Sequence, residues 1–208
     1  MSRVHVGLAA AALILALAAA GQDLRSAAEV TELAFAIEAA GDYISAPDLA
    51  ERIVRGDTGL RVFDLRSRGD YEQFHVASAS HITLEALART ALPADATIVL
   101  YSDGVLNAAR GWRLLRARGQ ARVVVLREGL YEWIGRVVEP RLASDATAAE
   151  RAQFIRAAET SRFFGGLPLA SVPRADVPVG YWTGVHRNRQ EPAAVSRRAI
   201  ASIRRRGC

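Results

Sequence analysis

The chain has 208 residues, of which 50% are hydrophobic and 24% are charged, a composition typical of a globular protein. Its one cysteine, Cys208, excludes an intramolecular disulfide. The formal net charge is +5, but residues 181–208 alone carry seven arginines and one glutamate, so that segment is +6 and the other 20 arginines and 21 acids sum to −1. The charge therefore excludes a basic globular domain and indicates a basic tail.

Residues 1–21 begin with one basic side chain, Arg3, followed by an unbroken apolar run over residues 7–20. A basic start, an apolar stretch and three alanines before Gly21 are typical of a cleaved signal peptide. Counted from Val4, the run has ~17 residues, which is just enough for an uncleaved membrane anchor. Both readings predict that the rest of the chain is exported, while a third is an alanine-rich helix buried in a soluble protein.

Residues 22–42 are expected to contain an N-terminal helix, since apolar side chains recur at helical spacing between Ala27 and Ala40, and Gly41 ends the pattern. The next helix is expected to begin at Ser45, where a serine precedes an acidic residue by three positions, as in an N-terminal cap.

Short strands and helices then alternate over residues 43–139. The expected strands are Leu60–Leu65, Ser80–Ile82, Thr97–Tyr101 and Val123–Leu126, and the expected helices are Ser67–Gln73, Leu84–Thr90, Asn107–Arg118 and Leu130–Val138. Alternation of this kind predicts an α/β domain with a mainly parallel sheet and helices on both faces. Sites in such sheets lie at the carboxyl ends of strands, here after Leu65, Tyr101 and Leu126.

Residues 140–208 are expected to be a C-terminal extension. Ala143–Phe164 has a helical pattern, and the proline- and glycine-rich residues 167–192 predict an irregular arm. Pro192–Arg206 could form a basic amphipathic helix that lies on an anionic membrane surface, or it is a solvated tail. With no aromatic residue after Trp182, nucleic acid is not expected as a partner.

Four segments in this order resemble motifs of the rhodanese family and cover about residues 44–138. Asp64-Leu65-Arg66 is similar to an Asp-x-Arg motif at a strand end, and Asp70–Ala79, around His75, to a stretch that contains Gly-His-Ile-Pro-Gly-Ala. Ile98–Tyr101 resembles the strand before the catalytic loop. Val125–Trp133 is similar to Val-x-x-Leu-x-Gly-Gly-x-x-x-Trp, with Glu128 replacing one glycine. The resemblance implies a rhodanese-like α/β domain.

The resemblance also implies where sulfur chemistry would take place. A rhodanese holds sulfur as a persulfide on a cysteine thiolate, in a loop whose backbone N–H groups and helix N-terminus form an anion-binding cup. Here the cysteine position is Ser102, and the loop continues Asp103-Gly104-Val105-Leu106-Asn107. A serine forms no persulfide, and Asp103 is negative where an anionic substrate would approach. The implied supporting residues are Asp64, Arg66 and His75.

These features predict a non-catalytic binding or regulatory module of the cell envelope, whose loop, Ser102 to Asn107, contacts a protein partner or small ligand. The alternative is a sulfurtransferase or thiol-redox protein that uses Cys208 as a sulfur carrier, because the guanidinium groups of residues 204–206 would favour its thiolate. The ordinary interpretation of Cys208, an incidental exposed thiol, is favoured over the carrier. No cofactor and no metal are expected.

Overall fold

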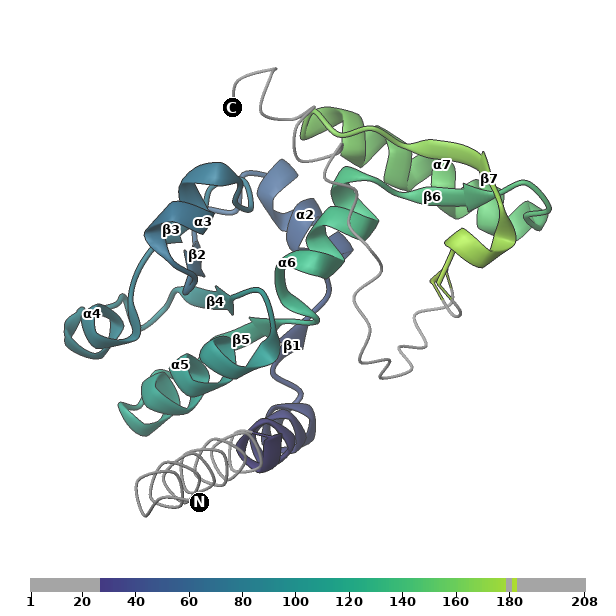
Figure 1. Cartoon of the computed structure of the whole chain (residues 1–208). Helices are drawn as coiled ribbons and strands as arrows, with labels where there is room; N and C mark the ends of the chain where they lie inside the picture. Colours follow the sequence, from purple (N-terminus) through teal and green to yellow (C-terminus); the bar gives the residue numbers. More distant parts are fainter. Residues whose placement is uncertain (1–26, 179–180, 183–208) are drawn as a thin grey trace, which may run out of the picture.

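The computed structural model describes residues 27–178, 181 and 182 (Figure 1). The apolar run over residues 7–20, the basic tail and Cys208 lie outside these residues, so their predicted roles stay predictions. Among the helices formed by the described residues, none is both long and apolar enough to cross a bilayer.

A five-stranded parallel sheet forms the centre of the domain, in the order β1-β5-β4-β2-β3. Its central strand, β4, pairs with β5 on one side and with the whole of β2 on the other, and four of its five residues are buried. This explains the continuous apolar sequence of β4, since a strand covered on both faces has no solvent side. The strands are β1 (Tyr43–Ile44), β2 (Leu60–Asp64), β3 (Ser80–His81), β4 (Thr97–Tyr101) and β5 (Val123–Leu126).

Helices cover both faces of this sheet, as the sequence predicted. Two clusters of buried side chains result, one involving α2 and α6 and the other involving the N-terminal helix, residues 27–40, with α4 and α5. Burying one large apolar side chain contributes about 1.5–3 kcal/mol, so the two clusters are the main source of stability. The helices are α2 (Ala46–Val54), α3 (Arg68–Gln73), α4 (Leu84–Arg89), α5 (Val105–Ala117) and α6 (Gly129–Glu132).

The two helix N-caps predicted from the sequence, Ser45 and Ser67, are present in the structure. The Ser45 and Ser67 side chains accept hydrogen bonds from the backbone N–H groups of Asp48 and Asp70, which confirms both expected N-caps. Two features of the domain were not expected. Strand β1 is only two residues long, and the helix expected over residues 130–138 is a single turn of α-helix followed by a π-helix, Trp133–Val138 (η1).

The C-terminal extension corrects the prediction in two respects. Helix α7 (Ala148–Phe163) begins after Thr147, whose side chain forms a capping box with Glu150, rather than at residue 143. The segment expected to be an irregular arm contains β7 (Leu169–Val172), which pairs in parallel with β6 (Arg141–Ala143), and a short 3-10 helix, Arg174–Asp176 (η2). Strand β7 is mostly exposed, so it lacks the apolar pattern that predicts a buried strand.

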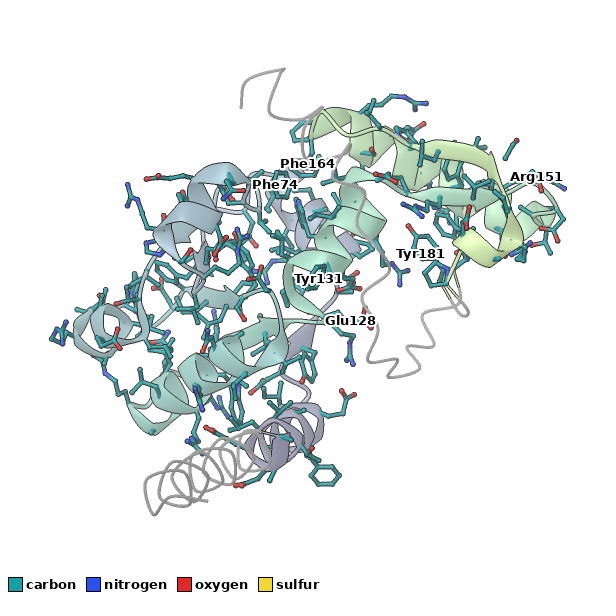
Figure 2. All side chains as sticks on the ribbon, viewed as in Figure 1. Phe74, Glu128, Tyr131, Arg151, Phe164 and Tyr181 are labelled. Carbon is teal, nitrogen blue, oxygen red and sulfur yellow. The ribbon has the colours of Figure 1, made fainter. Side chains whose placement is uncertain are left out.

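The extension packs against the domain at the end of η1. The Val138 carbonyl accepts hydrogen bonds from the Ser161 hydroxyl at 2.7 Å and from the Leu167 N–H at 2.8 Å. The Phe164 ring meets Trp133 edge to face, with 5.1 Å between ring centroids. Phe164 and Phe74, both labelled in Figure 2, pack against the first buried cluster.

Candidate functional site

The Ser102 loop connects β4 to α5, at the carboxyl edge of the sheet. Ser102 is buried, with 4% of its surface exposed, and its hydroxyl donates a hydrogen bond to the Gly104 carbonyl. Gly104 is the N-cap of α5, so this helix begins at Val105, two residues earlier than the sequence predicted. No side chain caps its N-terminus, which leaves the positive end of the helix dipole directed at the loop.

The start of α6 holds the backbone of Ser102 from the other side. The N–H of Leu130 donates a hydrogen bond to the Ser102 carbonyl at 3.0 Å. A Cβ atom on Gly129 would lie 2.2 Å from that carbonyl oxygen, and the φ of Gly129 is +60°. Glu128 also has a positive φ, +53°, at the position where the resembled motif has a second glycine. The Gly129 position therefore excludes any side chain, for steric and conformational reasons together.

Asp64 and Arg66 form the buried ion pair that supports the loop. Arg66 donates from Nη2 to Asp64 Oδ2 at 2.6 Å and from Nε to Oδ1 at 3.0 Å, and Nη2 also donates to the Phe74 carbonyl at 2.5 Å. The Asp64 side chain is fully buried and the Arg66 side chain is 6% exposed. A paired arrangement of this kind keeps two buried charges compensated.

The same guanidinium reaches the loop itself, because Arg66 Nη1 lies 3.6 Å from Asp103 Oδ1. The Asp103 side chain is 56% exposed, so this carboxylate stands at the mouth of the loop. Partial burial raises the pKa of Asp103, the nearby carboxylates of Asp70 and Asp64 raise it further, and Arg66 opposes the shift. When ionised, Asp103 places a negative charge at the mouth of the loop, and this charge would repel an approaching anion.

Neither histidine of this region acts on Ser102 in the structure. His75 stacks on the Tyr71 ring with centroids 4.1 Å apart, and its Nδ1 is 2.9 Å from the Tyr71 carbonyl. His81 Nε2 is 2.9 Å from the Arg66 carbonyl. Both rings therefore bond to backbone, and the part of the chain that the structure describes does not pair the Ser102 hydroxyl with a base.

Tyr101, at the end of β4, adds a neutral hydroxyl to the same buried region. Its oxygen accepts a hydrogen bond from the Val76 N–H at 3.1 Å. Burial raises the pKa of Tyr101, and the Asp64 carboxylate raises it further, so the phenol keeps its proton. The described residues contain no cluster of three or more histidine, cysteine or acidic side chains that could hold a metal ion.

Glu132, which lies in the same helical turn as Leu130, was not predicted as part of the site. This carboxyl is 3% exposed, and its Oε2 accepts a hydrogen bond from the Ala46 N–H at 3.0 Å. Burial raises the pKa of Glu132 to about 7. An acid next to a tryptophan in a short helix has no distinguishing spacing, so the sequence carried no signal for its burial.

Comparison with known proteins supports the assignment of the domain. Residues 45–136 match the family model of the rhodanese-like domain. No match was found among curated proteins. Similar solved structures include a rhodanese-like domain from Anabaena sp., 27% identical, which covers 44% of this chain and 72% of that chain with a TM-score of 0.41.

Two further similar structures are single-domain sulfurtransferases. The human protein is 20% identical, with a TM-score of 0.40 and coverage of 45% of this chain and 95% of that chain. The Saccharomyces cerevisiae protein is 10% identical, with a TM-score of 0.41 and coverage of 45% of this chain and 88% of that chain. The family model and the motifs around the Ser102 loop lead to the same conclusion: residues 45–136 of this chain form a domain of the rhodanese-like family.

Proposed function

We propose that the rhodanese-like domain of this chain is a non-catalytic binding module of the cell envelope, and that residues 102–107 contact its protein partner or small ligand. The observation that carries this proposal is Ser102. Its side chain occupies the position of the family's nucleophile, is buried, and donates a hydrogen bond to the Gly104 carbonyl.

Sulfur transfer through this residue is chemically blocked. A persulfide forms only on sulfur, and a serine oxygen cannot replace it. Acyl or phosphoryl transfer would require a base that accepts the serine proton. In the structure that proton is directed at a backbone carbonyl, while His75 and His81 bond to backbone carbonyls of their own.

Charge around the loop further disfavours the family's anionic substrates. The helix dipole of α5 attracts anions. Asp103 stands in front of that helix and is half-exposed, and the pKa of its carboxyl is raised by burial and then by Asp70 and Asp64 despite Arg66. A bound ligand would therefore donate a hydrogen bond to the Asp103 carboxylate, rather than bring a second negative charge.

The location of the module rests on sequence alone. The apolar run over residues 7–20 supports export, either with cleavage or as an anchor, and the seven arginines of residues 181–208 would bind an anionic membrane surface. A second candidate function rests on Cys208, a lone thiol next to three consecutive arginines, as a carrier of sulfur for a partner protein.

The two functions are separated by one measurement. The full-length protein is incubated with a polysulfide and weighed intact, beside the variants Cys208→Ser and Ser102→Cys. A binding module gains no sulfur as wild type, while Ser102→Cys gains one sulfur and shows that the assay detects a persulfide in this loop. A gain on the wild type that disappears in Cys208→Ser would overturn the proposal and establish Cys208 as the carrier.

A further inference from the structure

Glu132 connects two elements that are far apart in the sequence. It is the last residue of α6, and its carboxyl is almost fully buried. Its Oε2 accepts a hydrogen bond at 3.0 Å from the N–H of Ala46, the first residue of α2, which is also buried. The partial positive charge at that end of a helix favours the ionised form of Glu132, whereas burial, the larger effect, disfavours it.

The same helical turn holds the Ser102 loop. Within the four residues of α6, Gly129 lies against the Ser102 carbonyl and Leu130 donates a hydrogen bond to it. One end of this turn therefore contacts the proposed binding loop, and the other end contacts α2 through Glu132. Because the turn has only four residues and protein interiors are closely packed, a displacement of Glu132 also displaces Leu130.

The surroundings of Glu132 place its ionisation in the neutral range. Burial is the main cause of its raised pKa, about 7, and Glu128 adds to it, while the Ala46 N–H, Arg136 and Arg127 oppose it.

Helices α2 and α7 also contribute polar side chains to the surroundings of α6 and η1. On α2 the acid of the first turn is Asp48, which accepts a hydrogen bond from Ser45. Helix α7, which packs against η1, presents the uncharged Ser161 there. Burial and the Glu128 carboxylate thus raise the pKa of Glu132, and the Ala46 N–H group and two arginines oppose them.

We propose that Glu132 is a proton-responsive latch, whose charge state sets how firmly α6, and with it the Ser102 carbonyl, is held against the first turn of α2. With its proton, Glu132 stays buried and the latch is closed. Without it, a buried negative charge favours opening of the contact between α6 and α2, which loosens the loop. The functional meaning of this latch rests on the proposed binding role of residues 102–107, but the latch itself does not depend on a ligand.

The test is a pH titration of the full-length, isotope-labelled protein by NMR from pH 5 to 9. The Glu132 side-chain carboxyl carbon should titrate near pH 7, and the amide signals of Ala46 and Leu130 should shift with the same midpoint. Glu132→Gln, which keeps a carbonyl acceptor for Ala46 but cannot ionise, should abolish both amide shifts. The matched control is Glu139→Gln, since Glu139 is another buried acid at the end of η1 and pairs with Arg141 at 2.6 Å.

Three results would overturn the proposal. A carboxyl midpoint below pH 5 in the wild type, which needs no variant to fold, would remove the titration from the neutral range. A shift at Ala46 with none at Leu130 would show that α6 does not transmit the change. Persistence of the Leu130 shift in Glu132→Gln would assign it to another group. Each of these leaves the sulfur-uptake test untouched, so failure of the latch and failure of the binding module are distinguishable.

Discussion

In the rhodanese-like domain, two clusters of apolar side chains are buried on opposite faces of a five-stranded sheet. The described part of the C-terminal extension has one small cluster of its own, with Ala143, Val177 and Tyr181 buried. The extension also leaves apolar side chains in solvent, with Ile155 59% and Phe163 63% exposed. A small cluster of this kind stabilises little by itself. The extension therefore depends on its contacts with the domain, above all at the Val138 carbonyl, while the domain depends on its own core.

The largest expected effect is at Gly129, inside the domain. Gly129→Ala places a Cβ 2.2 Å from the Ser102 carbonyl oxygen and forces a positive φ on alanine, so we expect a loss of about 3–5 kcal/mol in the free energy of unfolding. Gly135→Ala is the matched control, because nothing lies within 4 Å of its added Cβ. Urea denaturation measures both, and a Gly129→Ala variant as stable as Gly135→Ala would contradict the tight contact.

Glu132→Gln tests the cost of a buried carboxyl in the domain. The unfolded chain releases this proton near pH 4.5, whereas the folded chain holds it up to about pH 7, so wild-type stability falls as pH rises between these values. The glutamine variant escapes that loss. Its free energy of unfolding relative to wild type should therefore rise between pH 4.5 and 8 by about 2–3 kcal/mol.

Urea denaturation at several pH values measures this difference. Glu139→Gln, which replaces another buried acid, one that pairs with Arg141, is measured in parallel as the matched variant. A difference between wild type and Glu132→Gln that stays constant with pH would show that the carboxyl titrates normally.

Ser161→Ala tests how the extension is attached. The Ser161 hydroxyl is buried and is one of two donors to the Val138 carbonyl, at the end of η1 where helical carbonyls lack partners. Removal of this hydroxyl should lower the free energy of unfolding by about 1–2 kcal/mol. It should also raise the rate of amide hydrogen exchange in α7 but not in β4. Thr160→Ala is the control, because the Thr160 hydroxyl bonds to the exposed Arg156 carbonyl of its own helix. Equal exchange changes in α7 and β4 would mean that the two regions unfold as one.

The same contrast explains which elements were predictable from sequence. Strands β4 and β5 were predicted because buried parallel strands have continuous apolar sequences, and the caps at Ser45 and Ser67 are local signals. Strand β7 was missed because Leu169–Val172 is mostly exposed and pairs with β6 across the whole of α7.

The candidate site likewise has a part that was predictable from the sequence and a part that was not. The loop at Ser102 followed from motifs that are contiguous in the chain. The contacts made to it by Gly129 and Leu130, and the burial of Glu132, depend on the position of α6 relative to the Ser102 loop and the first turn of α2, and no local pattern specifies that position.

The smallest expected effect is at Arg174, on the surface of the extension. Its guanidinium contacts Glu150 at 2.7 Å and Asp145 at 2.9 Å, and the hydrogen bond from Arg174 lowers the pKa of Glu150 to about 2. A depressed pKa contributes stability that is present above the unfolded value near 4.5 and is lost as pH falls toward 2. In Arg174→Ala the pKa of Glu150 should rise, so less stability is lost on acidification. NMR titration of the Glu150 carboxyl measures the shift directly. Because this ion pair lies at the surface, with the Arg174 side chain 44% exposed, the melting temperature at neutral pH should change less than in Ser161→Ala. A larger drop would show that the extension is held to its place by surface charge rather than by the buried contact at Val138, and the proposed division between the two regions would have to be redrawn.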